Sequence, residues 1–396
     1  MERKYDPLLH EAIRRGQRTV RERGIDILEK PVPDDPRPGA LDSRFLAGIP
    51  FLARKFGLVF CPFARRILSG GSPQKNASRM RRHFNDIRSL PLASGVRTSR
   101  MTVNAGSVPV EIRVYRRESP RGAGVSPSSV SSPTQEKLRP VFYYMHGGGF
   151  AAGSPDVVEE ICRQVTERTD CVGVQIDYRL APEHPYPAAL EDCYGVLRWL
   201  AGNAGSLGGA GGMICVAGDS AGGNLAAACA MRDRDEGFGA VKAQALLYPV
   251  LNPAGKEDGD FHFSMDQYDM LAEHRPAVSF MITIMRSGTS AMLKVLGVDE
   301  PGPLLAPYFG RLEGLPPAFI AYGEFDYFRL ESEAYARKLS LAGVPVRVIR
   351  YRGLAHAFAE LVGRQPQAED CMEEIGAFLK DIFYRQAEEV EEGRGK

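Results

Sequence analysis

A serine stands where an apolar segment meets an alanine-rich one, in "MICVAGDSAGGNLAAACA", residues 213–230. Residues 218–222 fit the pattern G-x-S-x-G, in which the serine occupies a strained turn between a strand and a helix. Such a turn lifts the Ser220 hydroxyl off the sheet, and the amino end of the helix favours developing negative charge. That chemistry would be nucleophilic attack. A serine that only caps the helix would give the same five residues, so the pattern alone leaves both interpretations open.

Three consecutive glycines, Gly147 to Gly149, directly follow the apolar segment "VFYYM". Glycines at the end of a strand can present their N–H groups to an oxyanion, because no Cβ hinders the approach. A phosphate-binding loop would need a Lys-Ser/Thr pair after the glycines, and the sequence has none there. The glycines therefore favour an oxyanion hole over a flexible linker or a phosphate cradle.

A serine nucleophile needs a histidine base, and the base needs an acid that orients it. His356, in "YRGLAHAFAEL", is the only one of seven histidines beyond residue 274. The segment "AYGEFDYFRLESEAYARKL" offers Glu324, Asp326 and Glu331 as acids. Asp326 is preferred, because it falls after the predicted strand and before the predicted helix. Glu324 falls in or beside that strand, and Glu331 falls one turn into the helix.

Five motifs in order carry a resemblance to a known family: "HGGGF", "DYRLAPEHPYPAALED", "GDSAGGNLA", "GLPPAFIAYGEFD" and "GLAHAF". Over about residues 95–385 the chain resembles the bacterial hormone-sensitive-lipase-like group of α/β-hydrolases, with the GDSAG form of the serine turn. The resemblance implies an α/β-hydrolase fold with a helical cap. It also implies a nucleophile, base and orienting acid at Ser220, His356 and Asp326, and oxyanion-hole N–H groups on Gly147, Gly148 and Ala221.

Further roles follow from the same resemblance. His146 would hold the glycine loop, and Asp219 would anchor the serine turn. Asp177, Arg179 and Glu183 would support the glycine loop from behind. The chain departs from the family after its acid, where it has Tyr327-Phe328 in place of Pro-Leu, and after its histidine, where Ala357 replaces glycine. These departures change the edge of the pocket, so the family's substrate preferences carry over weakly.

The predicted function is a serine carboxylesterase that hydrolyses short-chain acyl esters through an acyl-enzyme intermediate. No metal or cofactor is implied, and the partner is a small-molecule ester. An amide or carbamate hydrolase with the same triad stays open as an alternative. A lipase at a membrane surface also stays open, because residues 1–66 carry a net charge of +5 (14 Lys/Arg against 9 Asp/Glu) and include the apolar stretch "FLAGIPFLARKFGLVF". A non-catalytic receptor on this fold would need a broken triad, and all three residue types are present.

Apolar runs alternate with helical segments from about residue 139 onward, which predicts a mostly parallel sheet covered by helices on both sides. Residues 96–104 and 108–118 alternate apolar and polar residues, as the strands of a hairpin do. The Ser/Pro/Gly-rich residues 119–137 predict a loop. We expect residues 1–90 to form an N-terminal helical cap segment and residues 91–390 the catalytic domain. A Met-rich helical insert at about 253–300 completes the cap.

The whole-chain composition excludes several classes of protein. With 396 residues and a net charge of +1, the chain gives no general reason to expect a nucleic-acid partner. The chain has no apolar run of about 18 residues, and its start lacks an apolar signal core, so we expect a cytoplasmic protein without stable membrane insertion. Acidic residues dominate from Gln367 onward and offer partners for the basic N-terminus. The sequence leaves a homo-oligomeric state open.

Overall fold

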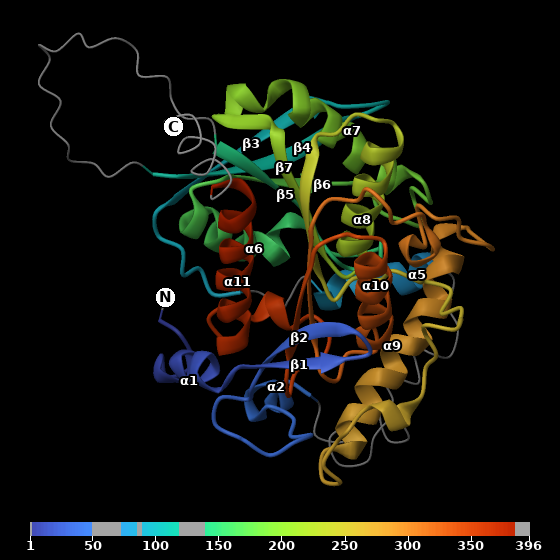
Figure 1. Cartoon of the computed structure of the whole chain (residues 1–396). Helices are drawn as coiled ribbons and strands as arrows, with labels where there is room; N and C mark the ends of the chain where they lie inside the picture. Colours follow the sequence, from blue (N-terminus) through green and yellow to red (C-terminus); the bar gives the residue numbers. More distant parts are fainter. Residues whose placement is uncertain (1, 50–72, 85–88, 119–138, 385–396) are drawn as a thin grey trace, which may run out of the picture.

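The computed structural model describes residues 2–49, 73–84, 89–118 and 139–384. They form a ten-stranded sheet with the order β1-β2-β10-β9-β8-β7-β5-β6-β4-β3 (Figure 1). Neighbouring strands from β10 to β6 in this order are parallel, and the hairpins at the two ends of the sheet are antiparallel within themselves. The strands are β1 Arg18–Glu22, β2 Ile25–Lys30, β3 Val96–Asn104, β4 Pro109–Arg117, β5 Arg139–Met145, β6 Val172–Asp177, β7 Gly209–Asp219, β8 Val241–Leu247, β9 Ala318–Gly323 and β10 Val346–Tyr351.

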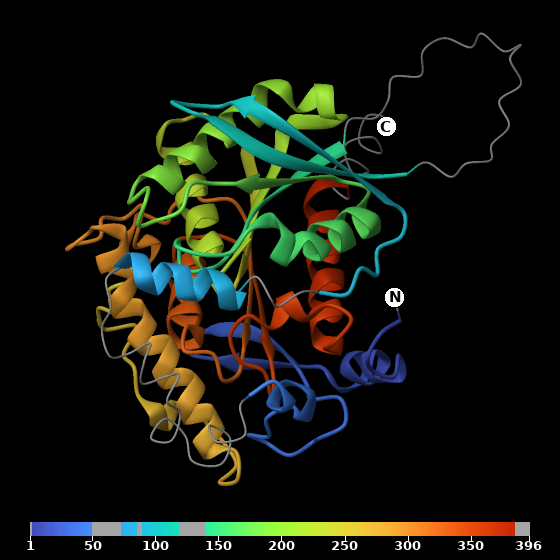
Figure 2. The ribbon, with the colours of Figure 1, turned by 180° about the vertical axis from the view of Figure 1, so that it is seen from behind.

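Helices cover both faces of this sheet, as Figures 1 and 2 show. α6 and α11 lie on one face, and α7, α8 and α10 lie on the other. The long helix α9 lies outside the helices that cover the sheet, near α5. The described helices are α1 Leu8–Gly16, α2 Ser43–Ala47, α5 Pro73–Phe84, α6 Pro155–Thr169, α7 Ala188–Asn203, α8 Ala221–Asp235, α9 Arg275–Leu296, α10 Arg329–Leu341 and α11 Pro366–Phe383, with short 3-10 turns at Ala204–Leu207, Met265–Gln267, Pro307–Phe309 and Phe358–Leu361.

The mostly parallel sheet predicted from the apolar runs is confirmed. All residues of β9, and all of β5 after Arg139, are buried, because helices cover both faces of the sheet there. The predicted hairpin is also confirmed, since β3 and β4 pair antiparallel with Val96 opposite Arg117. The predicted loop at 119–137 lies outside the described residues.

The prediction of a wholly helical N-terminal segment is wrong for residues 18–30. These residues form the hairpin β1–β2, and β2 pairs with β10 in parallel, which extends the sheet. The alternating apolar residues of "IDILEK" suit a half-buried strand. Arg23 and Gly24 both have positive φ (46° and 90°), as the two central residues of a tight hairpin turn require. A two-residue turn at Arg-Gly is a weak signal in sequence, which is why the hairpin was missed.

Charged side chains attach this N-terminal segment to the last helix. Arg3 pairs with Glu369 at 2.9 Å. The buried Lys30 ammonium lies 3.1 Å from Asp370 and 2.6 Å from Glu374. The expected pairing between the basic N-terminus and the acidic C-terminal region is therefore present.

A second charged cluster joins the hairpin to the sheet and to α10. Arg350 of β10 lies 2.6 Å from Glu22, 3.1 Å from Glu29 and 3.1 Å from Glu333. The Arg350 side chain is only 7% exposed, so three carboxylates surround a guanidinium that water barely reaches. The hairpin is thus bound to the rest of the fold by charge as well as by backbone pairing.

Candidate active site

Ser220 occupies the turn between β7 and α8, with φ of 53°, a conformation that a residue other than glycine adopts only under strain. A Cβ on Gly218 would collide with the backbone of Gly222, and a Cβ on Gly222 would collide with the carbonyl of Met145. Both glycines are therefore required by close backbone approach. Within the described chain the Ser220 side chain makes no capping bond to α8, which contradicts the helix-cap interpretation.

The Ser220 hydroxyl instead contacts His356. His356 Nε2 lies 2.9 Å from Ser220 Oγ, and His356 Nδ1 lies 2.9 Å from Asp326 Oδ2. His356 follows β10 and Asp326 follows β9, so the carboxyl ends of neighbouring strands bring the two side chains to the same edge of the sheet. The three residues predicted from sequence thus form one hydrogen-bonded series.

The other two acidic residues considered from sequence have different partners. Glu324 accepts a hydrogen bond from the backbone N–H of Gly353 at 2.8 Å. Glu331, in α10, accepts from the N–H of Leu251 at 2.7 Å, and burial raises its pKa to about 8. Neither carboxylate contacts His356, so Asp326 is the acid that the structure brings to the imidazole.

Aromatic rings that the sequence did not single out enclose the imidazole. The Tyr248 ring lies edge-on to His356 with centroids 4.9 Å apart, and the Phe328 ring lies 5.1 Å away. Both rings are buried and pack against the imidazole. Tyr268, from the insert at 253–300, donates its hydroxyl to the carbonyl of Asp326 at 3.0 Å. No sequence motif marks Tyr248 or Tyr268.

The glycine loop is anchored to the serine turn through Asp219. Asp219 Oδ1 accepts hydrogen bonds from Tyr144 Oη and from the N–H of Gly147, each at 2.9 Å. The N–H of Gly147 is therefore engaged, and the expectation that it faces an oxyanion is corrected. Among the residues that the structure describes, the N–H groups of Gly148 and Gly149 have no hydrogen-bond partner.

Burial perturbs the groups around this anchor. Burial raises the pKa of Asp219 to about 6, and its second oxygen, Oδ2, has no hydrogen-bond partner within the described part of the chain. Burial lowers the pKa of His146 to about 4, which keeps the imidazole neutral. Its Nδ1 lies 2.7 Å from the carbonyl of Gly147, so this nitrogen carries the hydrogen and donates it. His146 also stacks on Tyr178, with centroids 4.2 Å apart.

Two of the three residues expected to support the glycine loop have other immediate partners. Arg179 pairs with Asp192 at 2.7 Å. Glu183 pairs with Arg81 at 2.6 Å, and Arg81 itself contacts the glycine loop. Asp177 pairs through its backbone with Glu111 of β4 in the sheet. The loop is therefore held from α5 as well as from Asp219, and nothing in the sequence marked α5 for this.

The same region matches a known family. A family model described as the alpha/beta hydrolase fold matches residues 142–360, more than half of the chain. The chain belongs to the α/β-hydrolase fold family. This α/β-hydrolase is 33% identical over 296 residues to the esterase LipI of Mycobacterium tuberculosis, covering 74% of this chain and 84% of LipI. It is 33% identical over 260 residues to an arylesterase of Saccharolobus solfataricus, covering 65% of this chain and 79% of the arylesterase.

Solved structures agree with the assignment. An esterase of Pyrobaculum calidifontis superposes on this α/β-hydrolase with a TM-score of 0.64 and 30% sequence identity. The match covers 98% of that esterase but 81% of this chain. About a fifth of this α/β-hydrolase therefore has no counterpart in that superposition.

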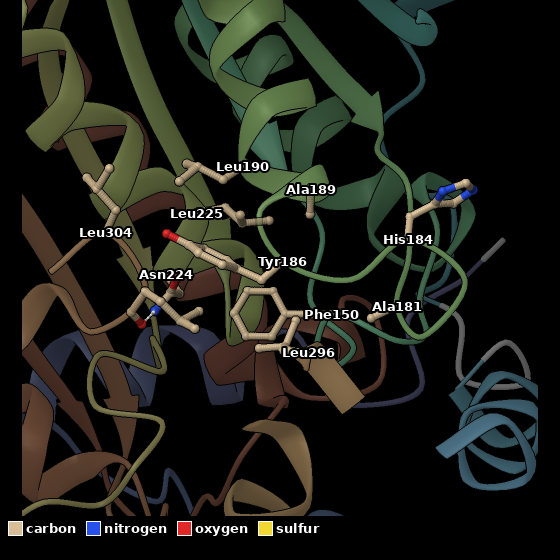
Figure 3. Close-up of a pocket in the computed structure, with 11 residues that line it drawn as sticks. Phe150, Ala181, His184, Tyr186, Ala189, Leu190, Asn224, Leu225, Leu296 and Leu304 are labelled. Carbon is tan, nitrogen blue, oxygen red and sulfur yellow. Dashed lines mark hydrogen bonds between the residues drawn. The ribbon is translucent and has the colours of Figure 1, made fainter. Parts of the chain in front are cut away.

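A small apolar cavity lies one turn of α8 beyond the serine of this α/β-hydrolase (Figure 3). It measures about 10 Å³, which suffices for about one water molecule. Phe150 and Tyr186 both line the cavity, together with Leu296 at the end of α9 (Figure 3). Ser220, Asp326 and His356 do not line the cavity, so it adjoins the reacting groups without containing them.

Residues from both expected cap segments lie above the glycine loop. A Cβ built on Gly149 would lie 3.2 Å from Met80 Cε of α5 and 3.8 Å from Met292 Cε of α9. The two methionines thus approach the loop from regions about 200 residues apart in the chain. The apolar stretch "FLAGIPFLARKFGLVF" lies outside the described residues from Pro50 onward, including Phe51, Phe56 and Phe60.

Proposed function

We propose that this carboxylic-ester hydrolase cleaves short-chain acyl esters with Ser220 as nucleophile, His356 as general base and Asp326 as the orienting acid. One observation carries the proposal: the hydrogen bonds from Asp326 through His356 to Ser220, each 2.9 Å long. Ser220 Oγ attacks the acyl carbon while His356 Nε2 takes its proton. Buried Asp326 stabilises the resulting imidazolium and holds Nδ1–H toward itself.

The oxyanion of the tetrahedral intermediate would be held by the N–H groups of Gly148, Gly149 and Ala221. Gly149 takes the place first given to Gly147, whose N–H already donates to Asp219. Ala221 opens α8, where the first N–H groups of a helix have no partner within the helix. Such fixed donors, aimed at the charge that develops in the transition state, contribute strongly to acyl-transfer catalysis.

The reaction has two stages, acylation of Ser220 and hydrolysis of the acyl-enzyme. Collapse of the first intermediate breaks the C–O bond, and His356 returns its proton to the leaving alkoxide, which departs as the alcohol. Water then attacks the Ser220 acyl ester, again giving a proton to His356. Collapse of the second intermediate releases the carboxylic acid and restores the serine.

We propose that the chain divides into an N-terminal segment, residues 1–90, and a catalytic domain, residues 91–390. We also propose that α5 and the insert at 253–300 form the cap over this site. Met80 and Met292 support the proposed cap, because both approach Gly149. The hairpin β1–β2 is an exception to the division, since it belongs to the central sheet. A covered site leaves a short acyl slot, because each added methylene gains only about 0.8 kcal/mol on burial and soon meets overpacking.

An acyl-chain series of p-nitrophenyl esters tests the proposal. We expect kcat/KM to peak at two to about six acyl carbons and to fall steeply by twelve, from the balance of burial against overpacking. A maximum beyond about ten carbons that increases at a lipid interface would favour the lipase alternative instead. Among the described residues, no helix has the length and apolar character to cross a membrane. Faster cleavage of matched anilides or carbamates than of esters would favour the amide or carbamate alternative.

A covalent labelling experiment identifies the nucleophile. A fluorophosphonate should attach covalently to Ser220 in the wild type, as located by peptide mass spectrometry, and should not attach to Ser220→Ala. A cytoplasmic location remains an expectation from the sequence.

A further inference from the structure

One side chain outside the triad contacts both the glycine turn and the loop that follows β6. Arg81, in α5, donates from Nε to the carbonyl of Ala151 at 2.7 Å and from Nη2 to the carbonyl of Ala181 at 3.0 Å. Its Nη1 and Nη2 also donate to Glu183, at 3.0 Å and 2.6 Å. All three guanidinium nitrogens are engaged, although the Arg81 side chain is 31% exposed.

The carbonyl that Arg81 holds belongs to a strained turn. Gly148, Gly149 and Phe150 have successive positive φ values of 116°, 61° and 61°, and Phe150 is not a glycine. Inside the turn, the N–H groups of Ala151 and Ala152 donate to the carbonyl of Gly148, at 3.2 Å and 2.9 Å. A strained conformation persists only where its surroundings over-determine it. Arg81 supplies part of that support through Ala151.

A second contact fixes the turn to the loop after β6. The carbonyl of Phe150 accepts from the N–H of Ala181 at 2.9 Å, and Arg81 binds the carbonyl of Ala181 itself. The guanidinium therefore bridges two backbone segments that already contact one another. Met80, the residue before Arg81, lies against Gly149, so α5 rests directly on the turn.

We propose that Arg81 is a positioning residue of the oxyanion hole, holding the peptide units of Gly148 and Gly149 in the orientation that receives the oxyanion. The inference rests on the proposed function, because it assigns Arg81 to the same site. The planar fork of arginine fits this task, since it meets two carbonyls and a carboxylate at once, whereas the single ammonium of lysine cannot reproduce that geometry. The N-terminal segment thereby contributes to stabilising the transition state.

Three variants test the inference: Arg81→Ala, Arg81→Lys and the matched control Arg82→Ala. Arg82 is the exposed neighbour of Arg81, and its Nε bonds the carbonyl of Ser78 in its own helix at 3.3 Å. Because oxyanion stabilisation acts in the transition state, Arg81→Ala should lower kcat by roughly ten- to hundredfold with KM changed less than about twofold. The fall should be equal for p-nitrophenyl acetate and butyrate. Arg81→Lys should fall between Arg81→Ala and wild type, and Arg82→Ala should match wild type.

Two results overturn the inference. The first is a wild-type kcat in Arg81→Ala. The second is a raised KM with unchanged kcat, because α5 would then be only a wall of the substrate pocket. If Arg81→Ala does not fold, Arg81→Lys tests the inference in its place, because it keeps the positive charge opposite Glu183. A folded Arg81→Lys with wild-type kcat contradicts the inference. Failure of the proposed function is distinct: the wild type would then not react with a fluorophosphonate at Ser220, whatever the Arg81 variants do.

Discussion

The middle of the sheet and its N-terminal end are held together by different forces. Strands β5 and β7 to β9 consist mainly of buried apolar residues, and the loops at their carboxyl ends carry Ser220 and Asp326. At the N-terminal end, β1 is largely exposed, and the buried Lys30 and Arg350 are surrounded by carboxylates. A close-packed apolar core is stiff and accepts apolar substitutions of similar volume, whereas a buried charge demands a particular partner. The middle strands therefore form a rigid frame, and the hairpin β1–β2 is attached to it by the ion pairs of Lys30 and Arg350.

Removal of the proposed nucleophile, on the loop after β7, should have the largest effect on kcat. Ser220→Ala should lower kcat on a simple aryl ester by about 10⁴- to 10⁶-fold, because the triad acts as a unit. Thermal unfolding should stay close to wild type, since the strained turn loses only an oxygen. Retention of even about a tenth of the wild-type kcat would contradict the mechanism.

Replacement of the proposed orienting acid, Asp326, should have the second-largest effect on kcat. The N–H of Phe328 donates to Asp326 Oδ1 at 2.8 Å, and Asp326→Asn keeps an oxygen that can accept this bond. It removes the charge beside His356 and favours the wrong tautomer, so kcat should fall by about 10³- to 10⁴-fold in a folded protein. Steady-state kinetics with Glu331→Gln as control checks this. A severe loss in Glu331→Gln together with a mild loss in Asp326→Asn would move the acid to α10.

Loss of an ion pair that attaches the N-terminal segment should lower the stability of the protein and leave kcat unchanged. Lys30→Met leaves Asp370 and Glu374 without the cation that lies between them, and should lower the free energy of unfolding by about 3–5 kcal/mol. Urea unfolding measures this, with kcat of the folded variant close to wild type.

Arg21→Met is the matched control for that experiment. Arg21 and Asp26 form an exposed pair at 2.9 Å, which should contribute less than about 1 kcal/mol. Equal losses in the two variants would show that burial does not distinguish the two pairs, contrary to the comparison drawn between the regions.

The change expected over one pH unit is smaller than the loss in Lys30→Met, and it concerns the buried carboxyl of α10. Burial raises the pKa of Glu331 to about 8, above its value in the unfolded chain, so the native state binds the proton more tightly. The free energy of unfolding should therefore fall as pH rises toward 8, by up to about 1.4 kcal/mol per pH unit from this group. Glu331→Gln should lose this slope, so its stability relative to wild type should rise from pH 5 to pH 8. A difference that is constant with pH would contradict the assignment.

The same contrast between regions explains what the sequence could reveal. The hydrogen-bonded series of Asp326, His356 and Ser220 was predictable, because apolar runs mark the strands and each of these residues follows one of them. Gly147 was misassigned, because three adjacent glycines look alike until Asp219 is seen to bind one of their N–H groups. The hairpin β1–β2 was missed because its strands are short and rich in charge, and the carboxylates that match Lys30 and Arg350 come from distant positions. Arg81 belongs to a helix with no motif, so only the fold brings it to Ala151.

The pairing of β2 with β10 has a consequence for biosynthesis. Ile27 lies opposite Val348, more than 300 residues later, so β2 leaves the ribosome long before the strand with which it pairs. Until then Ile25 and Ile27 lack the neighbours that bury them in the finished protein. Contacts between such distant residues slow folding and leave strand edges open to aggregation. During synthesis β2 should therefore need protection for longer than strands that pair with near neighbours, and enzymatic activity should appear only after residue 356 has emerged.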